Sequence, residues 1–262
     1  MEGMKLADFL GHAEIRVHLS EGALIACEVQ RTWRKPSVTR KARFEFVPGE
    51  RADALNALAD WIATAPARRS IVWIIGTTEA QYFMLPWSPA WMGRATRDAY
   101  ARAHYEQLFE RDASQSAFCF AAQAGDNGQL VSCISLELQT ELAAHAEQAN
   151  CELGGIKPSI PAVWERFRDV LEGEQGTLCV VDGDREAIVR HNRKRIEEIV
   201  IKPCSRAPAA VATSREGVVR KFSNVAGWTF APKSAADLEL PTQEGFVARR
   251  DSAYAFALCG AL

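Results

Sequence analysis

The sequence predicts a mixed α/β protein with two halves, because two groups of three consecutive strands recur along the chain. In the first strand, Ile15, Val17 and Leu19 alternate with polar residues, and the turn at 20–22 leads into the next strand. The second group begins near Gly176 with the same pattern but no readable sequence similarity. The expected strands are 14–19, 23–33 and 42–47 in the first group, and 177–181, 186–190 and 196–202 in the second.

A short buried strand lies between the two groups. Residues 71–75 are all apolar and Gly76 follows them, which favours a strand covered on both faces. An amphipathic helix over 55–62 precedes this strand. The extended segment 81–87 comes next and contains Pro86, which cannot continue a strand ladder.

A helix is expected after this segment. Ser88 can cap a helix, and Pro89 can occupy the first helical position, where its missing N–H costs nothing. We therefore expect a helix from there to Phe109. Next we expect a hairpin of strands 117–123 and 129–135, followed by a helix over 138–149 that Gly154-Gly155 ends. A strand at 156–160 and a helix beginning at Ser159 and Pro161 come after it. Loops with short strands and one helix are expected over 203–250, and a terminal helix over 252–262.

Composition excludes several classes of function. The 262 residues are 48% hydrophobic and 24% charged, with a formal net charge of -2, so nothing favours binding to nucleic acid or to an anionic membrane. Seven cysteines lack CxxC spacing and the N-terminal residues lack the apolar core of a signal peptide, which favours reduced thiols in a bacterial-type cytosol. The apolar run at 253–262 is too short to span a bilayer.

The strand at 70–76, the Leu85-Pro86-Trp87 corner and the helix ending in Glu106-Gln107-Leu108 resemble one family. It contains the cytoplasmic domain of the type II secretion L subunit, GspL, and the type IV pilus protein PilM. The resemblance implies a degenerate actin-like fold with two lobes, in which the first lobe is 1–172 and the second, reduced lobe is 173–251. It also implies that 252–262 packs back on the first lobe.

An actin-type ATPase would need two phosphate-binding turns, one in each half. The first turn, 18–22, has no Asp, and the second, 181–185, has Asp182 and Gly183 without a following Gly-Thr or Gly-Ser. Arg185 and Glu186 stand where phosphate oxygens would approach, and a double-glycine adenosine loop is missing from 203–250. We interpret Asp182-Gly183 as a hairpin turn and expect no catalytic residue, no cofactor and no metal site.

Other chemically reactive residues also indicate packing. The five histidines are dispersed, and His18 lies on the polar side of its strand, where a surface or packing role is expected. Cysteines in the expected strands are interpreted as small buried apolar residues, and these are Cys27, Cys119, Cys133 and Cys179. The basic segment 191–195 is interpreted as a solvated turn.

Trp87 and Trp91 are the candidate partner-binding residues. Both tryptophans could pack at the corner, or one could be an exposed anchor for another protein, since tryptophan is enriched at interface centres. The sequence leaves both interpretations open.

The resemblance implies a non-enzymatic cytoplasmic scaffold, peripheral to the inner membrane and without a transmembrane segment, closer to PilM than to membrane-anchored GspL. Its partners would be an assembly ATPase and inner-membrane pilus or secretion proteins, and a homodimer stays open. The alternatives are an actin-like ATP-binding protein or kinase with an atypical nucleotide site near Asp182, and a polymerising actin-like protein.

Overall fold

The structure is a computed structural model of the 262-residue chain. It describes residues 13–31, 35–65, 69–89, 93–121, 128–173, 175–192, 195–204, 217–225 and 235–262.

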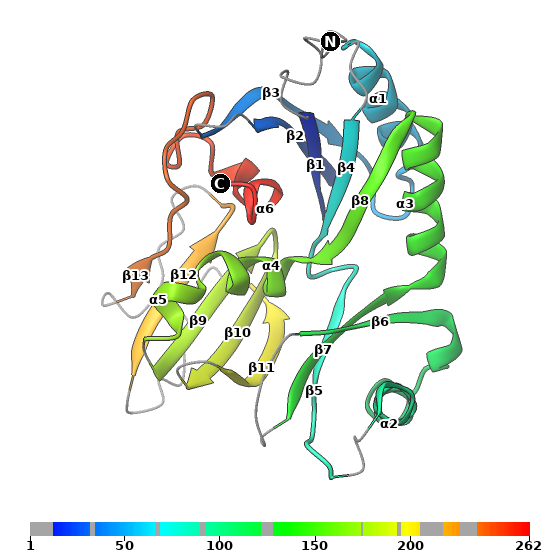
Figure 1. The fold of residues 1–262 in the computed structure, drawn as a ribbon, viewed down its shortest axis with the longest axis vertical. Helices are drawn as coiled ribbons and strands as arrows, with labels where there is room; N and C mark the ends of the chain where they lie inside the picture. Colours follow the sequence, from blue (N-terminus) through cyan, green and yellow to red (C-terminus); the bar gives the residue numbers. More distant parts are fainter. Residues whose placement is uncertain are drawn as a thin grey trace, which may run out of the picture.

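The first sheet has five strands in the order β3-β2-β1-β4-β8 (Figure 1). Its first three strands form the expected antiparallel meander, β4 pairs in parallel with β1, and β8 pairs in parallel with β4. Residues 71–75 are all buried, which explains why the sequence shows no alternation there. The strands are β1 (Ala13–Ser20), β2 (Ala23–Arg31), β3 (Pro36–Glu45), β4 (Arg69–Ile75) and β8 (Cys151–Pro158).

Helices cover both faces of this sheet (Figure 1). On one face, His145 of α3 (Leu136–Gln148) donates to the Leu55 carbonyl of α1 (Ala52–Ala63) at 2.9 Å, and its ring packs edge-on against Trp73. The other face is covered by the chain's last residues, together with α4 (Ser159–Arg166). The sheet is therefore the middle layer of three.

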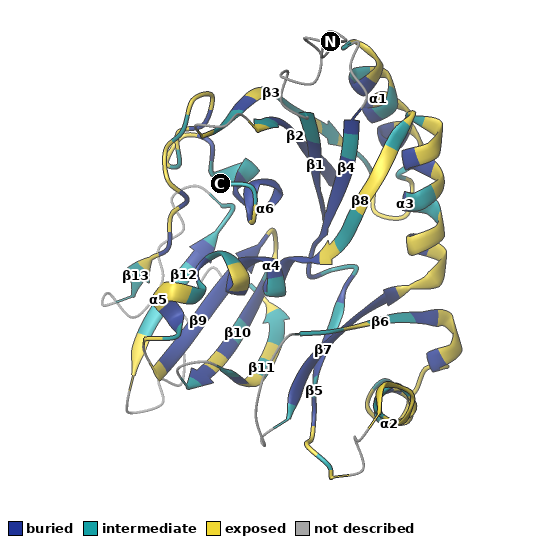
Figure 2. Cartoon of the chain, in the orientation of Figure 1, coloured by how far each residue is buried: buried dark blue, intermediate teal, exposed yellow. Residues whose placement is uncertain are grey.

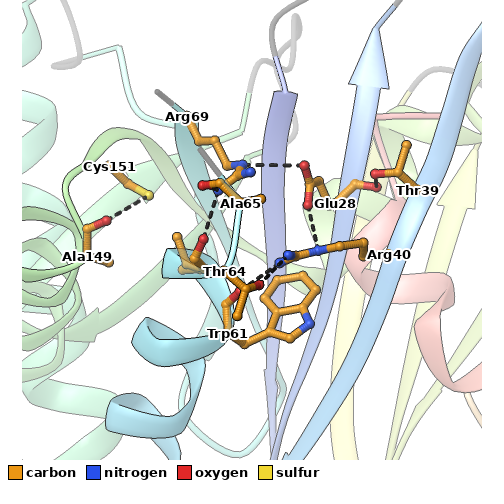
Figure 3. Close-up of polar contacts among 10 residues, drawn as sticks. Glu28, Thr39, Arg40, Trp61, Thr64, Ala65, Arg69, Ala149 and Cys151 are labelled. Atoms are coloured by element: carbon orange, nitrogen blue, oxygen red, sulfur yellow. Dashed lines mark hydrogen bonds and ion pairs between the residues drawn. The ribbon is translucent and has the colours of Figure 1, made fainter. Parts of the chain in front are cut away.

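Two arginines fix the end of α1 (Figure 3). Arg69 donates to the carbonyls of Ile62 and Ala65, and Arg40 donates to that of Trp61 and lies over its ring. These cations satisfy carbonyls that a helix leaves unpaired at its C-terminus and complement its dipole. Glu28 of β2 lies 2.8 Å from Arg40 and 3.4 Å from Arg69, so one carboxylate is shared by the two guanidinium groups.

The second sheet has the order β11-β10-β9-β12-β13. A three-strand meander again precedes a strand that pairs in parallel with the first, here β12 beside β9. α5 (Arg168–Leu171) connects this sheet to the first. Its strands are β9 (Gln175–Asp182), β10 (Arg185–Asn192), β11 (Arg195–Pro203), β12 (Val218–Ser223) and β13 (Ala236–Asp237).

A third, antiparallel sheet follows β4 and has the order β5-β7-β6. It contains the expected hairpin and forms a small core of its own with α2, centred on Phe83, Tyr105 and Val131. The elements are β5 (Gln81–Leu85), α2 (Arg94–Phe109), a 3-10 turn (Ala113–Gln115), β6 (Ser116–Phe120) and β7 (Gln129–Ser135).

The predicted start of α2 was wrong. The helix begins at Arg94 after an extended Gly93, so Ser88 and Pro89 do not open it. Both residues carry local signals for a helix start, but a capping residue and a proline only favour a start and do not fix one, because most helix stability comes from tertiary packing. Gly93 serves as the N-cap, which glycine tolerates well.

The Gly154-Gly155 pair was also assigned to the wrong role. α3 ends at Gln148, and both glycines lie within β8. The register with β4 shifts there, from Ile71 opposite Leu153 to Val72 opposite Gly155, so Gly154 is the extra residue of a bulge. A Cβ at Gly154 would come within 2.9 Å of Val72 Cγ2, which explains why glycine is needed.

Three smaller expectations also changed. β3 begins at Pro36, six residues before the expected start at 42, because its residues pair with β2 as far as Arg31. His191 is buried within β10 and does not lie in a solvated turn. Cys119 lies in β6 as expected but is exposed, since β6 is an edge strand.

The expected terminal helix is much shorter than ten residues. A 3-10 turn (Ser252–Tyr254) leads into the four-residue α6 (Ala255–Leu258), and Gly260 then adopts a left-handed conformation that ends the helix. Phe256 and Leu258 are fully buried all the same.

Candidate functional site

The candidate site lies where the hairpin turns of the two large sheets meet. Asp182, the last residue of β9, is 3% exposed. Its Oδ2 accepts from the Thr77 backbone N–H at 3.1 Å and lies 3.2 Å from His18 Nε2. Its Oδ1 accepts from Asn224 Nδ2 at 3.1 Å. One carboxylate thus joins the ends of β1, β4, β9 and β12.

His18 takes the packing role, one of the two roles that the sequence left open for it. It is fully buried, and its ring stacks on Phe256 with centroids 4.8 Å apart. The alternation in β1 placed it on a polar side, but the C-terminal residues cover that side. Because an ionised carboxylate only accepts hydrogen bonds, Nε2 carries the hydrogen that it donates to Asp182.

Gly76 allows this contact to form. A Cβ at that position would lie 2.6 Å from the Leu19 carbonyl oxygen and 2.8 Å from Asp182 Oδ2. No larger residue fits without moving β1 or Asp182. The glycine that closes β4 therefore lets the two sheets approach each other at this point.

The mouth of the site is acidic. Glu21 in the β1–β2 turn faces Asp184 in the β9–β10 turn, and a hydrogen bond to Asp184, burial and the negative charge of Asp184 raise the pKa of Glu21. Arg185 lies 3.8 Å from Asp184, and buried Glu186 pairs with Lys202 at 3.3 Å. The Thr77 N–H, His18 and Asn224 are thus already bound to Asp182, and the acidic side chains of Glu21 and Asp184 lie beside this contact.

Metal binding has no support in this region. Among the residues that the structure describes, no group of three His, Cys, Asp or Glu side chains could hold a metal ion.

Within the described ranges, no helix has the length and apolarity needed to cross a membrane.

The C-terminal residues are held by a buried arginine that the sequence analysis did not single out. Arg16 of β1 donates to the carbonyls of Ala257 and Cys259 at 2.6 and 2.5 Å, and it pairs with Glu14 at 2.6 Å. A charged residue between apolar neighbours in a central strand was the available signal. This contact holds Phe256 against His18.

One of the two candidate partner-binding residues lies at the end of the third sheet. Trp87 follows β5 and is 48% exposed. Trp91 lies outside the described residues. A cavity of about 450 Å³ lies at the other end of β5, and its lining includes Gln81, Tyr105, Arg111 and Ser135.

Comparison with solved structures identifies the fold. The chain matches the cytoplasmic domain of EpsL, an inner membrane component of the type II secretion system of Vibrio cholerae, over 94% of both chains, with a TM-score of 0.63 and 12% identity. It also matches a Bacteroides thetaiotaomicron protein with an actin-like ATPase fold over 77% of this chain and 74% of that one, with a TM-score of 0.51 and 10% identity. The fold is actin-like.

A third match is a PilM-PilN type IV pilus biogenesis complex, with a TM-score of 0.55 and 14% identity over 72% of this chain and 61% of that one. No protein-family model and no curated protein matches the sequence. The actin-like fold expected from the resemblance to PilM and GspL is therefore confirmed by structural neighbours from secretion and pilus systems.

Proposed function

We propose that this chain is a non-enzymatic, PilM/GspL-like scaffold of a type IV pilus or type II secretion-like machine. It would link the assembly ATPase to inner-membrane components by protein–protein binding, as a cytoplasmic protein peripheral to the inner membrane. The division into lobes 1–172 and 173–251, with 252–262 on the first lobe, belongs to this proposal.

The observation that carries the proposal is the position of Asp182. In an actin-type site, the two hairpin turns offer N–H groups to phosphates across a gap. Here the Asp182 carboxylate of the second turn instead joins the two sheets, because it accepts the Thr77 N–H at the end of β4 and contacts His18 of the first turn. A bound phosphate would have to displace this carboxylate and approach the acidic side chains of Glu21 and Asp184. The displacement and the proximity of acidic groups both make phosphate binding less favourable.

Likeness to the structural neighbours supports the binding role. EpsL is described as an inner membrane component, and PilM was solved with PilN. In the present chain, exposed Trp87 and the cavity beside Gln81 and Arg111 offer two surfaces for partners. We assign Trp87 and Trp91 to partner binding and the cavity to a partner's extended polar segment.

The enzymatic alternative is tested by heating the protein with Mg-ATP. We expect no change in melting temperature and no hydrolysis. A ligand at a hundred times its Kd stabilises by about 2.7 kcal/mol, which would be easily seen. A shift of that size, lost in Asp182→Ala, would establish a nucleotide site instead.

Partner binding is tested by capture of the assembly ATPase and the inner-membrane pilus or secretion proteins that the proposal names as partners. Trp87→Ala should weaken capture by more than about tenfold, which is 1.4 kcal/mol. Val47→Ala is the matched control, because Val47 is 64% exposed on another part of the surface. Equal capture by wild type and Trp87→Ala would remove Trp87 from the binding surface.

A further inference from the structure

β8 is an open edge of the first sheet. It pairs with β4 on one side only, and Glu152, Leu153, Gly154 and Lys157 are exposed (Figure 2). An edge strand presents unpaired N–H and C=O groups that can pair with another strand. No ion pair is formed by Glu152 or Lys157 with any described residue.

The sequence of β8 is complementary to itself when reversed. In Cys151–Pro158, antiparallel pairing about a point between Gly154 and Gly155 places Glu152 opposite Lys157 and Leu153 opposite Ile156. A twofold axis repeats each of these contacts. Self-complementarity of this kind is what an isologous interface between identical subunits requires.

The bulge makes this register sterically consistent. In a regular strand, residues three apart point to opposite faces, so Leu153 and Ile156 could not meet across a twofold axis. Here Leu153 pairs with Ile71 and Ile156 with Trp73, which lie two apart in β4 and so share a face. Gly154 is the extra residue that brings Leu153 and Ile156 to the same side of β8.

The glycines suit the centre of such an interface. Each of the two β8 strands would contain the same extra bulge residue, so the two strands have equal lengths on either side of the twofold axis. A Cβ built on Gly155 meets nothing within 4 Å, which leaves open space at this point. The two glycines at the centre of the interface have no side chains, and the apolar and charged pairs lie on either side of them. In this register each charged residue faces one of opposite charge.

We propose that a second copy of this chain binds at β8, by antiparallel pairing of the two β8 strands into one continuous ten-stranded sheet. Glu152 of each copy pairs with Lys157 of the other, and Leu153 packs on Ile156. The surface is distinct from Trp87 and from the Asp182 contact, so the proposal stands or falls independently of the scaffold function.

The test is a charge-reversal cycle, followed by sedimentation over a range of protein concentrations. Wild type should show a concentration-dependent monomer–dimer equilibrium. Glu152→Lys and Lys157→Glu should each weaken dimerisation by about tenfold or more, because each creates two like-charge pairs. The double variant Glu152→Lys/Lys157→Glu should restore it.

Mixing the two single variants gives a sharper result. One has lysine at both positions and the other has glutamate at both, so each alone should be monomeric and the mixture should form a heterodimer. Glu45→Lys on β3, the opposite edge of the same sheet, is the matched control and should dimerise like wild type. A monomeric wild type, or a dimer indifferent to the β8 reversals, would overturn the proposal.

Discussion

The two large sheets have the same strand topology but differ in how they are covered. In each, three antiparallel strands are followed by a strand that pairs in parallel with the first. All of residues 71–75 in β4 are buried, whereas Phe222 alone is buried in β12. The first sheet, with helices and the C-terminal residues on its two faces, therefore contributes more of the apolar core.

Equivalent positions also differ in chemistry. Ser20 and Asp182 each close the first hairpin of their sheet, by pairing with Ala23 and Arg185. Counting back from them, Arg16 and His18 in β1 correspond to Leu178 and Val180 in β9, and all four are buried. In β1, Arg16 and His18 contact residues that are distant in the sequence. The stability of the first half therefore depends on residues outside its own sheet.

The largest effect is expected from removing residues 253–262. Phe256 and Leu258 are fully buried against the first sheet, and each stabilises by roughly 1.5–3 kcal/mol. Their loss also removes the carbonyl partners of Arg16 and uncovers its side of β1. The truncated chain should be insoluble or molten by circular dichroism, whereas removing Ala261 and Leu262 alone should leave it folded. An unchanged melting curve for the longer truncation would contradict the role of these residues.

Arg16→Leu introduces the residue that the second half has at the equivalent position. It should destabilise by about 3 kcal/mol, because the carbonyls of Ala257 and Cys259 lose a buried charged donor. Chemical denaturation measures this change. Arg31→Leu is the control, since Arg31 is 52% exposed and pairs with the same Glu14. Similar losses in both variants would show that the contact with the C-terminal residues is unimportant.

Asp182→Ala removes one polar contact between the two halves. We expect a loss of about 2 kcal/mol, because His18, Thr77 and Asn224 lose a charged acceptor. Hydrogen exchange at the end of β4 should speed up more than exchange in β10. Asp184→Ala, at an exposed position in the same turn, should change stability by within about 0.5 kcal/mol. Equal effects of the two substitutions would argue against a specific role for Asp182.

The smallest effect concerns thiol reactivity. Burial raises the pKa of Cys27 in the first sheet and of Cys179 in the second to about 12, so neither should react quickly near pH 8. Exposed Cys119 on β6 should account for the fast phase with a thiol reagent, and Cys119→Ser should remove it. A fast phase that survives this substitution would show that Cys119 is not the reactive thiol.

The sequence by itself determined most of the strands, the hairpin over β6 and β7 and the repeated meander, because alternation and turn residues act over a few positions. It also indicated that Asp182-Gly183 is a hairpin turn. Local sequence patterns gave the wrong prediction where the same residue type is typical of two different structures. Gly154-Gly155 could end a helix or form a bulge, and only pairing with β4 selects the bulge.

The tertiary structure alone decided the candidate site. His18 and Asp182 are 164 positions apart, and no pattern in either segment indicates the contact. Alternation showed that His18 and Ile15 face opposite sides of β1, but it cannot show what covers the second side. That side is covered by Phe256 near the end of the chain, where Arg16 binds the last carbonyls. Long-range packing buries these polar residues, because each finds its hydrogen-bond partner only in the folded chain.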